Sequence, residues 1–118
     1  MSPKRRDRVA PPPRSDEYDL RFANNEAAKG WTDLCNQAAA NARAAYEAIR
    51  AHPCPMPMTG RHHRLKHTLG TGTHNGQTFE QWQFEVTGGG RIWYLVDHEA
   101  RVAWLTFAGT GHPKATDR

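Results

Sequence analysis

The sequence predicts an α+β fold in which two helices cover one face of a mainly antiparallel sheet. A short alternating stretch near residue 20 precedes a helical pattern that runs to about residue 51. Four alternating stretches separated by turn sequences follow. With 118 residues the chain is expected to form a single domain.

The first expected strand is "YDLRFA" (18–23), where apolar and polar residues alternate as in a half-buried strand. Asn24 or Asn25 is the expected N-cap of the helical segment, and an acidic residue follows in the first turn. Apolar residues then recur every three or four positions to about Ala51, and Pro53 stops the pattern. A break near "CNQAA" would give a helical hairpin in place of one rod.

Beyond a proline-rich loop (53–60) the hydrophobic period changes to two, as in strands. The expected strands are 64–70, 78–86, 91–96 and 101–107. Between them, "GTHNGQ", "TGGG" and "DHEA" suit hairpin turns.

Alternation along these strands also assigns the two faces of the sheet. Ile92 and Tyr94 fall on the side that the helices are expected to cover. The residues expected on the uncovered face are Gln83, Glu85, Arg91 and Trp93. A shift of one residue in strand register would exchange the faces.

The N-terminal segment 1–15 accounts for the net charge. The chain has 16 basic and 12 acidic residues and a formal net charge of +4; five of the basic residues but only Asp7 of the acidic ones lie in this segment. Residues 16–118, the expected folded domain, therefore carry eleven of each. Three consecutive prolines and few apolar residues predict a disordered basic tail, either a solvated leader or an arm that contacts RNA non-specifically.

Composition also bears on location. No stretch is apolar and long enough for a membrane span, and the basic N-terminus is followed by prolines in place of an apolar signal segment. Cys35 and Cys54 form neither a CxxC motif nor a disulfide framework. We therefore expect a cytoplasmic protein without a membrane partner.

The stretch "RHHRLKH" (61–67) lies in a region without acidic residues between Glu47 and Glu80. His63 and His67 would suit zinc on a helix, but on a strand they are separated by about 13 Å. We therefore expect no metal and no other cofactor. The donors of this stretch suit phosphate oxygens, although such strands are also often merely solvated. The expected phosphate-binding residues here are Arg61, His63, Arg64 and Lys66.

The order of these elements, with "RLKHTLG", "GGRIWYLV" and "GTGHPK" in sequence, resembles the RelE/ParE superfamily of bacterial toxin–antitoxin systems over about residues 18–114. The first motif is similar to the segment after the helices in the YoeB and YafQ branches. The second is similar to the strand that begins with the family's catalytic arginine. The third is similar to the terminal histidine motif of YafQ- and HigB-like members.

The resemblance implies a metal-independent mRNA interferase, an endoribonuclease that cuts messenger RNA, usually in the A site of the ribosomal 30S subunit, and is neutralised by a cognate antitoxin. By position, Arg91 would be the catalytic arginine, His112 the terminal histidine and His67 a functional histidine. Glu85 falls where other branches have a lysine or a histidine. Lys114 is expected to add positive charge beside His112.

The 2′-hydroxyl of RNA can cleave the chain if a base takes its proton, a cation stabilises the phosphate and an acid protonates the leaving oxygen. Imidazoles such as those of His67 and His112 suit the acid and the base, and Glu85 is a second candidate base. Arg91 would clamp the phosphate. Trp93 either stacks on an RNA base or belongs to the core.

Two other functions remain possible from the sequence. The ParE branch poisons DNA gyrase by binding, and a catalytically silent module could keep the fold within a repressor complex. Arg91, His67 and His112 argue against the gyrase poison, which needs no RNA-cleaving residues.

Overall fold

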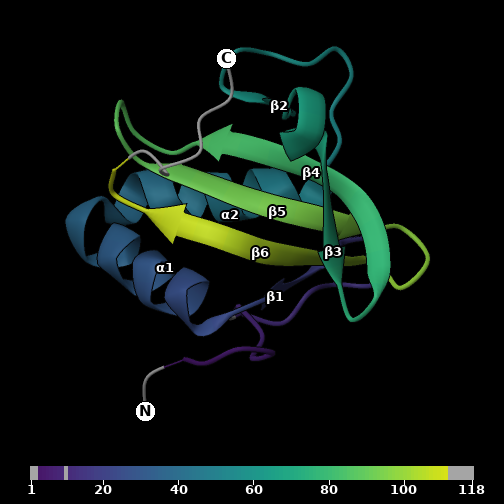
Figure 1. Ribbon diagram of the computed structural model, residues 1–118. Helices are drawn as coiled ribbons and strands as arrows, with labels where there is room; N and C mark the ends of the chain where they lie inside the picture. Colours follow the sequence, from purple (N-terminus) through teal and green to yellow (C-terminus); the bar gives the residue numbers. More distant parts are fainter. Residues whose placement is uncertain (1–2, 10, 112–118) are drawn as a thin grey trace.

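The computed structural model describes residues 3–9 and 11–111, and it confirms the α+β class (Figure 1). Its elements are β1 (Asp19–Phe22), α1 (Asn25–Gln37), α2 (Ala39–Ala51), β2 (His62–Arg64), the 3₁₀ helix η1 (His67–Gly70), β3 (Thr71–His74), β4 (Gln77–Glu85), β5 (Arg91–Asp97) and β6 (Val102–Gly109). Among the described residues, no helix has the length and apolar character needed to cross a membrane.

The strands form one sheet in the order β1-β6-β5-β4-β2, with β3 also paired to β4. β1 runs parallel to β6, and the other pairs are antiparallel. One edge of β4 pairs with β5. The other edge pairs with β2 at residues 82–84 and with β3 at residues 77–80, so β4 holds three strands.

The two helices form a hairpin that covers one face of the sheet (Figure 1). Asn24 caps α1, because its side-chain oxygen accepts a hydrogen bond from the backbone N–H of Ala27 at 2.7 Å. Ala38 alone separates the helices, so the expected break is confirmed. α1 lies so close to β6 that a Cβ added to Gly30 would be 1.5 Å from the carbonyl oxygen of Ala108. Only glycine fits there.

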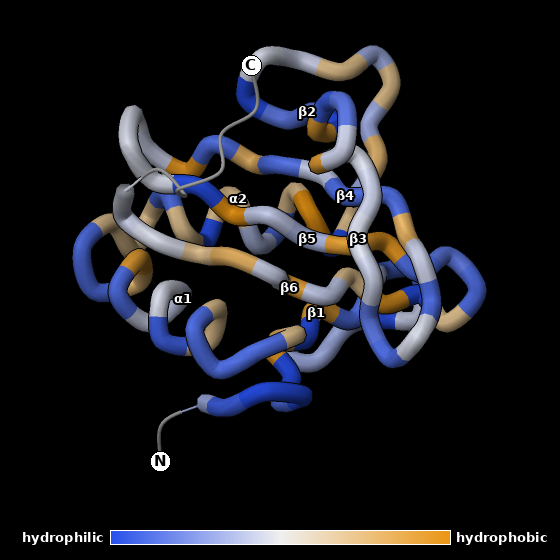
Figure 2. The backbone as a smooth tube through the Cα atoms, viewed as in Figure 1, coloured by the Kyte–Doolittle hydropathy of each residue, from blue (hydrophilic) through white to orange (hydrophobic). Residues whose placement is uncertain are grey.

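The main core lies between the helices and the sheet, in the register expected from alternation. Its sheet and helix residues include Trp82, Phe84, Ile92, Tyr94, Val96, Leu34, Ala45 and Ile49. Figure 2 shows hydrophobic residues along β5, where all six residues from Arg91 to Val96 are buried. A strand buried on both faces is central in its domain.

The hairpin of β3 and β4 folds over the sheet face opposite the helices, so this face is partly covered (Figure 1). The ring of His74 on β3 lies 4.2 Å from that of Trp104 on β6, two strands away from β4. Leu95 lies beneath this covering segment, since a Cβ added to Gly72 on β3 would be 2.8 Å from its Cδ2, and it is 0% exposed; Trp93 on the same face is 7% exposed. They lie outside the main core, so the sheet carries apolar contacts on both faces.

The expected strand at 64–70 is wrong, because the chain forms β2, then η1, then β3 in this region. His67 has a φ of 54°, a left-handed conformation that interrupts extended backbone. β3 was expected to be part of a turn. The turn itself is confined to Asn75 and Gly76, with φ of 51° and 78°, as in the two-residue hairpins that favour Asn-Gly.

Residues 3–9 and 11–15, which we call the N-terminal arm, pack against the body, and this corrects the expectation of a disordered tail. Val9 is 1% exposed and belongs to the main core. Its N–H donates to the carbonyl of Leu20 at 2.7 Å, and that of Arg6 donates to Phe22 at 2.8 Å. The arm therefore occupies the outer edge of β1. A single valine among charged residues has no periodicity, which is why the sequence pattern missed it.

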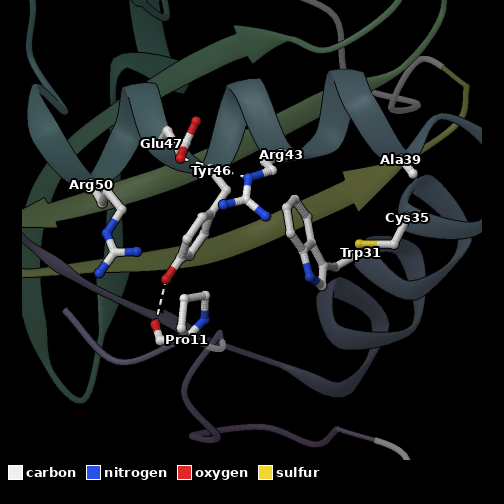
Figure 3. Close-up of a pocket in the computed structure, with 8 residues that line it drawn as sticks. All are labelled: Pro11, Trp31, Cys35, Ala39, Arg43, Tyr46, Glu47 and Arg50. Carbon is white, nitrogen blue, oxygen red and sulfur yellow. Dashed lines mark hydrogen bonds and ion pairs between the residues drawn. The ribbon is translucent and has the colours of Figure 1, made fainter.

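Further along, the arm lies against α2 (Figure 3). The hydroxyl of Tyr46 donates to the carbonyl of Pro11, and Nη2 of Arg50 donates to the carbonyl of Pro12 at 2.8 Å. Nη2 of Arg50 also lies 2.7 Å from a carboxylate oxygen of Glu17. The arm is thus attached to both the sheet and the helical layer.

We predict that Val9→Ala lowers the free energy of unfolding by about 2 kcal/mol, since it removes two buried methyl groups and leaves a cavity. The melting temperature should fall by several degrees in a thermal unfolding experiment. Lys4→Ala, an exposed change in the same arm, should leave the melting temperature unchanged. Equal melting temperatures for Val9→Ala and the unchanged protein would contradict the packed arm.

Candidate functional site

The neighbouring histidines of β2 lie on opposite faces of the sheet. His63 is directly opposite Gln83 on β4, and His62 is opposite Phe84. Directly opposed residues point to the same side, so His63 shares the face away from the helices with Gln83 and Glu85. His62 points toward the core, so the two neighbouring imidazoles lie on opposite sides of the sheet.

Arg61, Glu85 and Arg91 form the arginine–glutamate cluster, where the segment entering β2 meets β4 and β5. Oε1 of Glu85 lies 3.1 Å from Nη2 of Arg91, and Oε2 lies 4.0 Å from Nε of Arg61. The backbone N–H of Glu85 also donates to the carbonyl of Arg61 at 2.7 Å. One carboxylate therefore lies between two guanidinium groups, and the cluster has an excess of positive charge.

Arg91 lies on the expected face, but it is buried and holds a turn. Its side chain is 10% exposed. Nη1 donates to the carbonyl oxygens of Thr87, Gly88 and Gly90, at 3.0, 3.3 and 3.0 Å. These carbonyls belong to the β4–β5 turn, so the guanidinium fixes the turn in addition to pairing with Glu85.

Trp93 and Arg64 have packing roles in the structure. The indole N–H of Trp93 donates to Oε1 of Gln83 at 2.8 Å, and its ring lies 6.1 Å from that of Phe107. Because the residue is only 7% exposed, Trp93 offers no open stacking platform, and this favours a buried packing role over stacking on an RNA base. Nε of Arg64 donates to the carbonyl of Gly70 at 3.0 Å, and this bond ties η1 to β2.

His67 and Lys66 are exposed at the start of η1. Among the described residues, no hydrogen bond or ion pair joins His67 to Glu85 or Arg91. His112 and Lys114, the other expected members of the site, lie outside the described residues.

His62 is a buried, neutral histidine that sequence reasoning did not separate from its neighbours. It is 8% exposed, and its Nε2 is hydrogen-bonded to the hydroxyl of Tyr94, which donates to the carbonyl of Pro53 at 2.6 Å. Because that hydroxyl uses its only hydrogen in the bond to Pro53, it accepts from His62, and Nε2 of His62 is the donor. Burial, aided by the charge of His63, lowers the pKa of His62 to about 4. His62 therefore holds no charge for phosphate at pH 7.

The described residues also contain a cysteine next to a histidine. Sγ of Cys54 lies 3.8 Å from Nε2 of His98, whose Nδ1 is 2.7 Å from the hydroxyl of Tyr18. Burial, with a smaller effect of the Glu80 charge, raises the pKa of the Cys54 thiol to about 12. A protonated thiol is a poor nucleophile, so we assign the Cys54 side chain no catalytic role. It packs within the loop before β2. Within the described ranges, no group of three or more His, Cys, Asp or Glu side chains could hold a metal ion.

A cavity of about 360 Å³ lies between the helices and the N-terminal arm (Figure 3). Its lining residues are Pro11, Trp31, Cys35, Ala39, Arg43, Tyr46, Glu47 and Arg50. Both arginines of the lining are paired with carboxylates: Nε of Arg43 lies 3.7 Å from Oε2 of Glu47, and Nη2 of Arg50 lies 2.7 Å from Oε1 of Glu17. The cavity contains none of the expected site residues and offers no excess positive charge to a phosphate.

A scan against protein-family models found no match, and searches of curated proteins and of solved structures found none. What the structure itself establishes is the α+β fold, with β1 parallel to β6 in a mostly antiparallel sheet. The activity has to be inferred from the chemistry of the arginine–glutamate cluster and its surroundings.

We predict that His62 makes the protein less stable in mild acid. Because its pKa is lower in the folded state than the ordinary 6.5, its contribution is complete above pH 6.5 and is lost as the pH falls toward 4. Between pH 6.5 and pH 4, the imidazole of His62 binds a proton in the unfolded chain and stays neutral in the folded chain. Thermal unfolding from pH 7 to pH 4 should show a steeper decline for the unchanged protein than for His62→Gln. Parallel declines would contradict the assignment.

We predict that Arg91→Ala lowers the free energy of unfolding by about 2 kcal/mol, because the turn carbonyls and Glu85 lose a buried partner. Arg91→Lys should retain part of this stability. Arg61→Ala is the matched control: its side chain is 61% exposed, and its loss should cost less than about 0.5 kcal/mol. Chemical denaturation measures all three, and equal stability of the two alanine variants would contradict the structural role of Arg91.

Proposed function

We propose that the chain is an endoribonuclease of the RelE type, the toxin of a type II toxin–antitoxin system. It cuts messenger RNA in the ribosomal A site and so inhibits translation in the cytoplasm. The observation that carries the proposal is the arginine–glutamate cluster on the sheet face away from the helices. This is where the motif "GGRIWYLV", by resemblance, has its catalytic arginine.

In the proposed reaction the 2′-hydroxyl oxygen attacks the adjacent phosphorus, and the bond from phosphorus to the 5′ oxygen breaks. Glu85 accepts the 2′ proton, because its carboxylate lies between the two cations that would hold the phosphate. His112 gives a proton to the leaving oxygen, the role that the resemblance assigns to the terminal histidine. His67 is the alternative base. The protein's side chains carry every step of this scheme.

The two arginines would divide the binding of the phosphate. Arg91 uses Nη1 for the turn carbonyls, which leaves Nη2 on the side of Glu85. Arg61 is more exposed and less tightly paired, at 4.0 Å from Glu85. A phosphate that displaces this weak pair gains a charge-assisted hydrogen bond. Arg91 would thus hold the phosphate in a fixed position, and the more exposed side chain of Arg61 would adjust to it.

The alternative of a gyrase poison is less well supported by this chemistry. A protein that acts by binding alone has no need of a carboxylate positioned between two guanidinium groups. The proposed partners are accordingly messenger RNA, the ribosome and an antitoxin protein that keeps the toxin inactive.

We predict that Glu85→Gln reduces the cleavage rate by about 10² to 10⁴, the usual range for loss of an acid or a base. The change keeps the size of the side chain and removes its basicity. Cleavage is measured by primer extension on ribosome-bound message. Glu99→Gln, in the turn at the other end of β5, makes the same change of charge and should leave the rate unchanged.

Wild-type cleavage by a folded Glu85→Gln protein would exclude Glu85 as the base. Absence of cleavage by the unchanged protein, together with inhibition of gyrase supercoiling in a parallel assay, would replace the proposed function with the ParE-like alternative.

A further inference from the structure

The cations of the N-terminal arm fall into two groups. Arg8 and Arg14 are each paired with a carboxylate, at 2.9 and 3.5 Å. Lys4, Arg5 and Arg6 are exposed, and within the described residues their side chains have no acidic partner. Three adjacent cations are therefore left for a ligand, whereas the two paired arginines are already matched by carboxylates.

The three cations are held in a defined turn. The N–H of Asp7 donates to the carbonyl of Lys4 at 3.1 Å, and the N–H of Lys4 donates to Oδ2 of Asp7 at 2.9 Å. Arg6 has a φ of 75°, a conformation that residues other than glycine seldom adopt. The hydrogen bond from Arg6 to Phe22 and the buried Val9 anchor the turn to β1. Such backbone persists only where its surroundings fix it.

The turn lies beside the tip of the β3–β4 hairpin. Nη1 of Arg21 on β1 donates to the carbonyl of Arg6 at 3.0 Å, and Arg21 is opposite Trp104, whose ring lies 4.2 Å from that of His74. Burial, with a smaller effect of the Arg6 and Arg5 charges, lowers the pKa of His74, in agreement with this arrangement. That ring stacks on Trp104, which is opposite Leu95 in the sheet. The hairpin tip therefore lies on the face away from the helices, the face that carries the arginine–glutamate cluster. Figure 2 shows the first part of the described chain as strongly hydrophilic.

We propose that the Lys4–Arg6 turn is a second RNA contact, which binds the phosphate backbone separately from the arginine–glutamate cluster. Three cations without carboxylate partners suit phosphate oxygens along a strand and carry no base-reading groups, so the contact is independent of sequence. A membrane surface is a poorer fit, because the large exposed apolar side chains, Met56 and Met58, belong to the distant loop before β2. The identity of the polyanion as RNA rests on the proposed function.

The test uses the full chain with Lys4, Arg5 and Arg6 all changed to Gln. The probe is a fluorescent single-stranded 2′-O-methyl oligouridylate of about 12 nucleotides, within the usual range of single-strand binding sites. It has no 2′-hydroxyl and stays intact during binding. Anisotropy gives the association constant from about 50 to about 200 mM salt. Loss of three phosphate contacts should make the slope of log K against log salt shallower by about 2, at about 0.7 per contact.

The matched control changes Arg14, Lys29 and Arg43 to Gln, which removes the same charge at exposed positions away from the turn. It should keep a slope close to that of the unchanged protein. Equal slopes for both triple variants would overturn the proposal, because net charge and not the turn would then govern binding. An unaltered slope for the turn variant would overturn it as well.

Two further measurements separate this proposal from others. Binding to vesicles of phosphatidylserine and phosphatidylcholine tests the membrane alternative: loss of vesicle binding by the turn variant, with unchanged RNA binding, would refute the RNA contact.

Cleavage is assayed separately on ribosome-bound message. If the protein binds the oligonucleotide through the turn but cleaves nothing, the proposed function fails and the second contact stands. Unchanged melting temperatures establish that both triple variants are folded.

Discussion

The pairing of β4 along both edges is the constraint on which the rest of the molecule depends. One edge holds β5, and the other holds β2 and β3 in succession. The first pairing puts Glu85 opposite Arg91, and the second brings the chain at Arg61 to the backbone of Glu85. The same strand carries the hairpin that covers the outer face and reaches β6 through His74. The candidate site and the covering of the outer sheet face therefore both depend on the pairing of β4.

The parts of the fold that were predictable are those with a strong period. The second half of β4 alternates apolar and polar residues clearly enough to assign its faces, and Asn24, one of the two asparagines expected as the N-cap, starts α1. β3 was missed because "TGTH" contains no apolar residue whose burial would give it a period. His67 adopts a left-handed conformation that no pattern of hydrophobicity encodes.

The candidate site was predictable in its position and only partly in its environment. Alternation placed Glu85 and Arg91 on one face, and pairing then brought them to 3.1 Å. Burial was not predictable, because it depends on what covers a face: the hairpin over Leu95 and the turn carbonyls around Arg91 come from residues without a periodic signal. The same limit applies to His62, whose neutral state follows from the core around it and not from the charged sequence in which it lies.

The position of the N-terminal arm bears on how the folded chain behaves at high concentration. β1 is the last strand of the sheet on its side, and an outermost strand with free N–H and carbonyl groups is a template for pairing with another molecule. Here the arm uses those groups at Leu20 and Phe22. The chain thus covers its own sheet edge with backbone hydrogen bonds, which removes a template for strand pairing with another molecule.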